Sequence, residues 1–394
     1  MDVVSGEDAS LLQSATQRLL VAALRLYLDL RSRPRPLLRH LAKKPATPAD
    51  WSAVDPRAVP VAAVQMELAL VKSARQYADM CYEACRQAAA TGALLVAFPE
   101  DVATHLLGLL PGIERMAGAA GLGAGAADAA GAAGAAGAAG PSIKVADVFR
   151  LMGPAMRRIY TTTFSYLARA FRVYIAAGSA VLPATGDGKP RRGAPPPPVY
   201  NEAHLFDPRG QIVGRQRKLH LLPMEEEWGV EPGAELSTFG TPIGRVAMPV
   251  CMDSTFFETF RIADTLWSDI VVIPAANPEE YNFWKALRGI WPRVQESTVY
   301  GISSCMVGEV LGLKLTGRSG IFAPLEISPR GDGVLAQLDD PHRPGVVAAR
   351  VNLVALRELR ERRRASRPGR AMWRELSTAY GEYRARCGKS RTRL

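Results

Sequence analysis

Apolar residues along the chain switch between the spacing of helices and the short continuous runs of buried strands. Helical spacing predicts one helix between Leu11 and Ala23 and further helices over residues 72–91, 145–171, 256–265 and 288–298. Apolar runs predict strands over residues 59–67, 93–98, 173–181, 199–206, 212–218, 244–250, 269–273 and 299–307. Helices and strands therefore alternate over most of the chain.

The order of these elements indicates how they connect. The first strand, helix and strand after residue 58 are close enough in sequence to form a βαβ unit with a parallel strand pair. Gly92 follows the helix of this unit, at a position where a left-handed glycine cap is favoured. A turn of sequence Asp-Pro-Arg-Gly at residues 207–210 joins two strands and predicts an antiparallel hairpin. We expect a layered α/β sandwich.

Composition divides the chain into three parts. Residues 1–58 form a helical extension with a linker, residues 59–351 hold the alternating elements, and residues 352–394 form a basic helix and tail. Residues 117–140 are an insertion in the central part, composed of Ala and Gly except for Leu122 and Asp128. Because each Gly within a helix costs about 1 kcal/mol relative to Ala, we expect a flexible segment there.

Positive charge gathers at the C-terminal end. The net charge is +11, and the segment from Val351 to Leu394 contains 13 basic and 4 acidic residues. The rest of the chain is nearly neutral, so the basic residues do not surround a site. This pattern favours a solvated helix and arm over nucleic-acid binding.

Several protein classes do not fit the sequence. No apolar run approaches the roughly 20 residues that cross a bilayer, and acidic residues replace the basic start of a secretory signal. We therefore expect a cytoplasmic protein without a membrane segment. The five cysteines are odd in number and widely spaced, which does not fit a disulfide framework. Cys81 and Cys85 lack a second Cys/His pair near them in the sequence, so we expect no metal site there. We also expect no cofactor.

Three polar residues each follow a predicted strand. Glu100 follows ALLVAFP, Lys218 follows QIVGRQR, and Cys251 follows GRVAMPV. Ligand clefts of α/β proteins form at strand ends. A thiol needs to become a thiolate to be a strong nucleophile, a carboxylate can take its proton, and an ammonium favours the anion. Each residue alone also fits a structural role: a small core residue, a solvated strand end or a helix-start carboxylate.

The sequence around these three residues resembles the nitrilase, or carbon–nitrogen hydrolase, superfamily. The matching motifs, in chain order, are Phe98-Pro99-Glu100, Tyr200-Asn201 with Asp207 and Gly210, Arg217-Lys218-Leu219-His220-Leu221, Cys251-Met252-Asp253 with Phe256, Glu258 and Arg261, and residues 269–274, 293–296 and 317–321. The resemblance covers roughly residues 59–351. It implies a four-layer αββα sandwich and a homodimer, or a higher homo-oligomer, that brings two sheets face to face.

The resemblance also implies catalytic roles. Cys251 would be the nucleophile and Glu100 the general base and later the acid. Lys218 and the backbone N–H of Met252 would bind the oxyanion. Met252 itself departs from the family pattern, in which Tyr, Trp or Glu is common after the cysteine.

Two assignments near the lysine have alternatives. Family members often carry a second glutamate seven or eight residues after the lysine, where Glu225, Glu226 and Glu227 compete, and we choose Glu225. His220 lies two residues after Lys218, and strand geometry alone does not exclude it as a base. The chemistry favours the carboxylate base, with His220 packing or orienting its neighbours.

The resemblance implies hydrolysis of a small linear amide or carbamoyl compound through a cysteine thioester. Nitrile hydrolysis is the alternative reaction, although the motif KLHLLPMEEEWG is closer to the amidase branch. A non-catalytic binding protein on the same fold is the alternative of another class. The substrate is not predicted, because loops over residues 106–116 and 277–287 are expected to set the pocket size.

Overall fold

The structure, a computed structural model, describes residues 6–52, 54–113, 144–185, 195–286, 289–363, 372 and 374–382. The Ala/Gly insertion at 117–140 and most of the basic tail lie outside the described residues. In the part of the chain that is described, no helix is long and apolar enough to cross a membrane.

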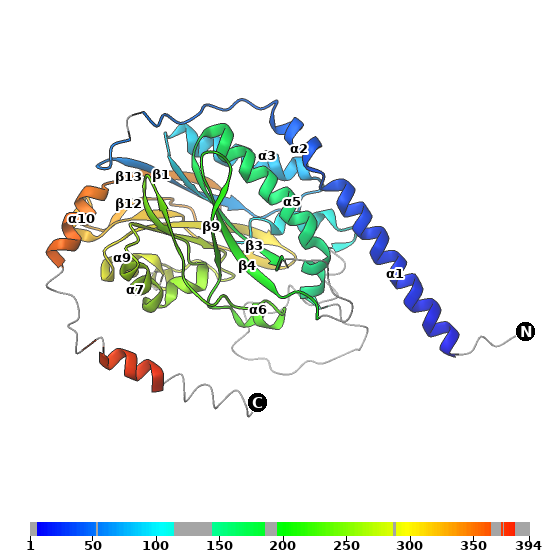
Figure 1. The fold of residues 1–394 in the computed structure, drawn as a ribbon. Helices are drawn as coiled ribbons and strands as arrows, with labels where there is room; N and C mark the ends of the chain where they lie inside the picture. The colour runs from blue at the N-terminus through cyan, green and yellow to red at the C-terminus, as the bar shows by residue number, and fades with distance from the viewer. Residues whose placement is uncertain are drawn as a thin grey trace, which may run out of the picture.

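Thirteen strands of the described chain form two sheets, which are joined where the ends of β1 and β9 pair in parallel at Met66↔Met306 and Glu67↔Val307 (Figure 1). The first sheet has the order β5–β4–β3–β2–β1–β13, and the second has the order β6–β7–β8–β9–β11–β12, with β10 beside β9. The strands are β1 (Val59–Glu67), β2 (Leu95–Ala97), β3 (Tyr174–Pro183), β4 (Val199–Phe206), β5 (Ile212–Arg217), β6 (Thr238–Thr241), β7 (Gly244–Ala247), β8 (Ile270–Ala275), β9 (Tyr300–Val310), β10 (Leu313–Leu315), β11 (Gly320–Phe322), β12 (Val334–Gln337) and β13 (Gly345–Val351).

Helices cover both outer faces of this pair of sheets. The helices of the described chain are α1 (Gly6–Arg31), α2 (Pro34–Leu41), α3 (Ala74–Ala90), α5 (Val145–Phe171), α6 (Pro223–Glu227), α7 (Phe257–Thr265), α8 (Phe283–Ala286), α9 (Ile290–Glu296) and α10 (Leu353–Arg362), with short 3-10 turns η1 (Thr104–Leu109), η2 (Cys251–Thr255) and η3 (Leu325–Ile327). Helices α3 and α5 pack on the first sheet, and α7 and α9 pack on the second.

Three apolar clusters fill the spaces between the four layers. Alternate residues of β1 divide between them, since Ala62 and Val64 face α3 and α5 whereas Val61 and Ala63 face the second sheet. In β8, the side chain of Val272 lies in the same cluster between the sheets. Its neighbours Val271 and Ile273 lie in the cluster under α7 and α9. Because side chains of a strand point alternately to the two faces, this division confirms the αββα sandwich.

The predicted βαβ unit and hairpin are confirmed. β1 and β2 pair in parallel, and β4 and β5 pair antiparallel. Ser73 caps the start of α3 by accepting a hydrogen bond from the backbone N–H of Gln76, at 3.1 Å. Gly92 follows the end of α3 with φ of +80°, the left-handed conformation that glycine adopts without steric cost.

The N-terminal extension contains a second helix that the apolar spacing did not predict. The predicted helix is α1, which projects from the body in Figure 1. The additional helix α2 packs beside α3 and α5 through Leu37 and Leu41, which are buried in their apolar cluster. The extension is thus attached to the first layer of helices.

Candidate active site

Glu100 is held where β2 ends against β3. Gly178 of β3 has φ of +65°, and a Cβ atom there would lie 1.8 Å from the carbonyl oxygen of Pro99. Only glycine fits this close approach, which fixes the backbone directly before Glu100. The Glu100 side chain is 2% exposed, and its Oε2 accepts a hydrogen bond from the backbone N–H of Ala276 at 2.9 Å.

Lys218 follows β5 and points into the protein. Its backbone N–H donates to the carbonyl of Asn201 at 2.8 Å, which continues the pairing of β4 and β5 by one residue. The Nζ atom lies 2.8 Å from Oε1 of Glu100 and 2.6 Å from Oε2 of Glu225. At 1% exposure, the ammonium is almost wholly removed from solvent and is compensated by two carboxylates.

Glu225 is the glutamate of α6 that reaches this cluster. It is buried, whereas Glu226 and Glu227 are exposed. Its Oε2 also accepts a hydrogen bond from the backbone N–H of Leu222 at 2.9 Å, which is the return bond of a helix-start capping box. The structure therefore brings the chosen one of the three candidates next to Lys218.

Asn201 joins the two carboxylates and was not assigned a role from the sequence. Its Nδ2 donates to Oε1 of Glu100 at 2.9 Å and to Oε1 of Glu225 at 3.1 Å. The residue stands in the Tyr200-Asn201 motif, so that motif was the signal that could have identified it. With Lys218, it forms a buried bridge that fixes the orientation of both carboxylates.

Cys251 lies at a strained turn after β7. It has φ of +46°, a left-handed conformation that costs a non-glycine residue roughly 1–2 kcal/mol. Cys251 is the first residue of the 3-10 turn η2, and Met252 is the second. The first backbone N–H groups of a helical turn have no acceptor within the turn, so they can donate to another group. The Sγ atom lies 3.7 Å from Oδ1 of Asn277, which is a second residue that the sequence did not identify.

Asp253 connects the turn at Cys251 to the segment after Lys218. Its carboxylate accepts hydrogen bonds from the backbone N–H groups of Leu219 at 3.1 Å, His220 at 2.8 Å and Val250 at 2.8 Å. These bonds hold two segments from different strands at a fixed separation. Asp253 is fully buried, so the bonds act without competition from water.

His220 contacts this connecting carboxylate. Its Nδ1 lies 2.8 Å from Oδ1 of Asp253, and its ring stacks on Phe256 with centroids 4.0 Å apart. Both contacts suit an orienting residue, which agrees with the role expected from the sequence.

Burial and charge set the protonation of the cluster. Burial raises the pKa of Glu100, Lys218 opposes this effect, and Glu225 adds to it. Burial also raises the pKa of the Cys251 thiol, with Glu100 adding to the rise and Lys218 opposing it. Burial alone would lower the pKa of Lys218, but the negative charges of Glu100 and Glu225 outweigh it, and the pKa is raised. The resting thiol is therefore neutral and the lysine is charged.

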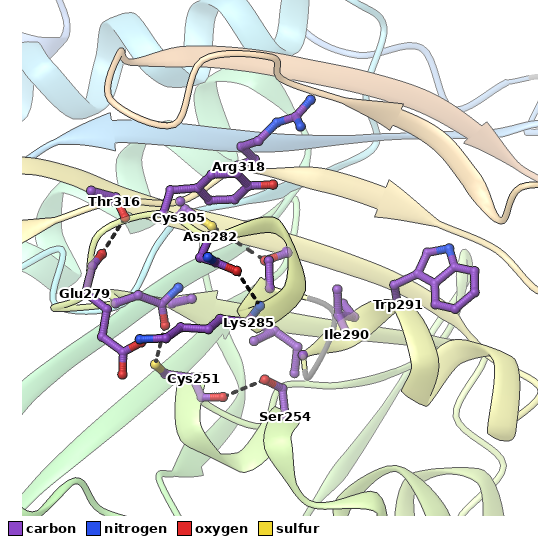
Figure 2. Close-up of a pocket in the computed structure, with 18 of the residues that line it drawn as sticks. Cys251, Ser254, Glu279, Asn282, Lys285, Ile290, Trp291, Cys305, Thr316 and Arg318 are labelled. Carbon is purple, nitrogen blue, oxygen red and sulfur yellow. Dashed lines mark hydrogen bonds and ion pairs between the residues drawn. The ribbon is translucent and has the colours of Figure 1, made fainter.

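Cys251 and Met252 border a cavity of about 570 Å³ (Figure 2). Residues 277–286 other than Trp284 form one of its walls, as the sequence predicted for that loop. The other predicted loop, residues 106–116, contributes none of its described residues to the cavity lining. In the described chain, no group of three or more His, Cys, Asp or Glu side chains is arranged to hold a metal ion.

The chain is similar in sequence to known carbon–nitrogen hydrolases. The carbon–nitrogen hydrolase family model matches residues 60–361. The probable hydrolase YhcX of Bacillus subtilis is 29% identical over 208 residues, which is 51% of this chain and 38% of that protein. A nitrilase of Pyrococcus abyssi is 34% identical over 166 residues, 42% of this chain and 56% of that protein. The human omega-amidase NIT2 is 29% identical over 124 residues, 29% of this chain and 41% of that protein.

The matched parts therefore span less than two thirds of each of these relatives. Among solved structures, a cysteine variant of the amidase from Nesterenkonia sp. AN1 in complex with butyramide superposes with a TM-score of 0.52. It is 18% identical, and the match covers 80% of this chain and 99% of that one. At this identity, the likeness concerns the fold.

Proposed function

The chain belongs to the carbon–nitrogen hydrolase family, and we propose that it hydrolyses a small linear amide through a cysteine thioester, with Glu100, Lys218 and Cys251 as catalytic residues. One observation carries this proposal: a buried lysine is held between two carboxylates, beside a strained cysteine that borders a cavity. The names of relatives, which include amidases and a nitrilase, support the same reaction class.

Formation of the thioester begins with proton transfer. Glu100 takes the proton of the Cys251 thiol, and its raised pKa makes it a better base than an ordinary carboxylate. The sulfur then bonds to the carbonyl carbon, and the carbonyl oxygen becomes negative. The ammonium of Lys218 and the backbone N–H of Met252 stabilise this oxyanion.

The second half of the reaction returns the protons. Glu100 gives its proton to the nitrogen as the C–N bond breaks, and ammonia or an amine leaves. Water then attacks the thioester carbon, with Glu100 again taking a proton. The carbon–sulfur bond breaks, the acid leaves, and Glu100 returns its proton to the Cys251 thiolate. Throughout the reaction, the ion pair with Glu225 holds Lys218 in place. Asn201 holds the carboxylates of Glu100 and Glu225 in a fixed orientation by donating a hydrogen bond to each.

The test of this proposal is a screen for ammonia release by the purified protein. It should include simple amides, carbamoyl amino acids and nitriles at equal concentration. We expect ammonia from amides and none from nitriles. Release from nitriles alone would favour the nitrilase reaction, and release from no compound by a folded protein would favour a binding role.

We also propose that the protein forms a homodimer. Helix α7 and the residues after it expose the large apolar side chains of Phe257, Ile262 and Trp267, at 46%, 46% and 57%. Pairing through this face would bury them and would bring the second sheets of two copies toward each other. An exposed group of apolar residues of this kind is typical of an interaction surface.

A further inference from the structure

The nucleophile has a polar side and an apolar side. Glu100, Lys218 and Glu225 form the polar side. Cys251 also belongs to an apolar cluster with Ile273, Ala275, Ile290, Cys305 and Phe322, all of which border the same cavity. Each of these five side chains is at most 7% exposed, so this wall is built from the edge of the protein core.

Five charged side chains also border the cavity, and each has a partner of opposite charge in the described chain. The pairs are Lys285 with Glu279 at 2.8 Å, Glu280 with Lys314 at 2.5 Å, Arg318 with Asp339 at 3.1 Å, and Asp332 with Arg330 at 2.9 Å.

Of the two cations, Arg318 is the more buried. Its Nε donates to the carbonyl of Leu338 at 2.6 Å, in addition to its ion pair with Asp339. A carboxylate on the substrate would therefore meet a guanidinium whose charge Asp339 already balances. It would also meet the like charges of Glu279 and Glu280, because both border the cavity. Burying a carboxylate without a dedicated partner is unfavourable.

We infer that the acyl group of the substrate is neutral and apolar, and longer than acetyl, and that it lies along the wall that contains Ile290 and Phe322. This inference rests on the proposed amide hydrolysis and narrows its substrate class. The carbonyl carbon would lie at Cys251, which has Glu100 and Lys218 as charged neighbours and belongs to the apolar cluster of the wall. Figure 2 shows Cys251 and Ile290 among the residues that line the cavity. A cavity of about 570 Å³ is within the range of small-molecule sites and is much larger than acetamide requires.

The test compares three amides on the wild-type protein: acetamide, hexanamide and adipamate, which is the hexanamide chain with a terminal carboxylate. We expect kcat/KM to rise roughly fourfold for each methylene between acetamide and hexanamide. We expect adipamate to be at least about tenfold poorer than hexanamide, because its carboxylate must be desolvated.

A pair of variants in α9 tests the position of the wall. Ile290→Ala should lower the ratio of kcat/KM for hexanamide over acetamide about tenfold, because a contact with the chain is lost. Val294→Ala is the control, since Val294 lies one turn further in the same helix and the same apolar cluster but does not border the cavity. It should leave the ratio unchanged.

The outcomes separate this inference from the proposed function. Ammonia release from adipamate at or above the rate from hexanamide would overturn the inference and leave amide hydrolysis standing. So would an unchanged ratio in the Ile290→Ala variant. A folded protein that releases ammonia from none of the three amides would overturn the proposed function and this inference with it.

Discussion

The Nζ atom of Lys218 lies 2.8 Å from Oε1 of Glu100, and both side chains are at most 2% exposed. An ion pair taken this far out of water is costly to form, and losing one partner leaves an uncompensated charge that costs about 3–5 kcal/mol. The proposed mechanism explains why this pair is kept in the protein. In that proposed mechanism, the lysine stabilises the oxyanion and the glutamate moves the proton.

Replacing this lysine should therefore impair both catalysis and stability. For Lys218→Ala we expect kcat/KM to fall about 100-fold to 1,000-fold, as for the loss of one oxyanion donor. We expect a lower melting temperature as well, because Glu100 and Glu225 would face each other without a cation. Lys218→Arg should not restore activity, since the guanidinium is planar and bulkier. Arg86→Ala is the control, because Arg86 forms an exposed ion pair with Glu83 within α3, away from the cavity. Near wild-type turnover by Lys218→Ala would refute the role of the lysine.

His220 should be replaceable without loss of the reaction. His220→Asn removes its contact with Asp253 but leaves the three backbone N–H groups bound to that carboxylate. We expect measurable turnover in this variant and a larger loss in Asp253→Asn, where a neutral amide replaces the charged acceptor. Steady-state kinetics of both variants provide the comparison. An inactive but folded His220→Asn variant, together with an active Lys218→Ala variant, would indicate a Cys–His dyad.

The pH dependence of kcat/KM should report Glu100. Below its pKa, Glu100 is protonated and cannot take the thiol proton, so activity should rise with pH. The midpoint should lie above 4.5, the ordinary value, because burial raises the pKa of Glu100. The negative charge of Glu225 also raises it, so Glu225→Gln should move the acid limb to lower pH. Glu226→Gln, which changes an exposed neighbour, should not move it. A limb that shifts upward in Glu225→Gln would contradict this electrostatic account.

A single substitution that introduces a charge can test the proposed dimer face. Ile262→Glu places a carboxylate among the exposed apolar side chains of α7 and should give a monomer in sedimentation experiments. Val213→Glu is the control, because Val213 is an exposed apolar residue of β5, at 43%, and lies in the other sheet. A variant at Ile262 that remains dimeric would exclude this face as the interface.

Local patterns were sufficient to predict the elements whose apolar spacing is long and regular. Strand β1 and helix α5 have the predicted bounds, because nine and 27 residues of consistent pattern leave little ambiguity. Strand β13 was not predicted. It pairs with β1 from Val59↔Val351 to Gln65↔Gly345. Its first five residues are only partly buried, Arg350 is exposed, and only Val351 is buried. Such a pairing depends on contacts distant in sequence, which local periodicity does not contain.

Some residues of the candidate site could be predicted from sequence motifs, and others required the structure. Motifs identified Glu100, Lys218 and Cys251, and the structure brings Glu100 and Lys218 into contact. The choice among three consecutive glutamates required the direction in which α6 faces, since neighbouring helix residues point about 100° apart. The Tyr200-Asn201 motif could have identified Asn201 itself. The bonds of Asn201 to both carboxylates, and the contact of Asn277 with Cys251, required the three-dimensional structure.

The most direct test of the mechanism is the rate of ammonia release from hexanamide by Cys251→Ala. The account predicts no release above background, because the thiolate is the only strong nucleophile in the proposed set. It also predicts an unchanged melting temperature, which would show that the variant is folded. Cys85→Ala, which removes another buried thiol far along the chain in α3, should keep wild-type turnover. Wild-type ammonia release by Cys251→Ala would show that Cys251 is not the nucleophile and would contradict the Glu–Lys–Cys mechanism.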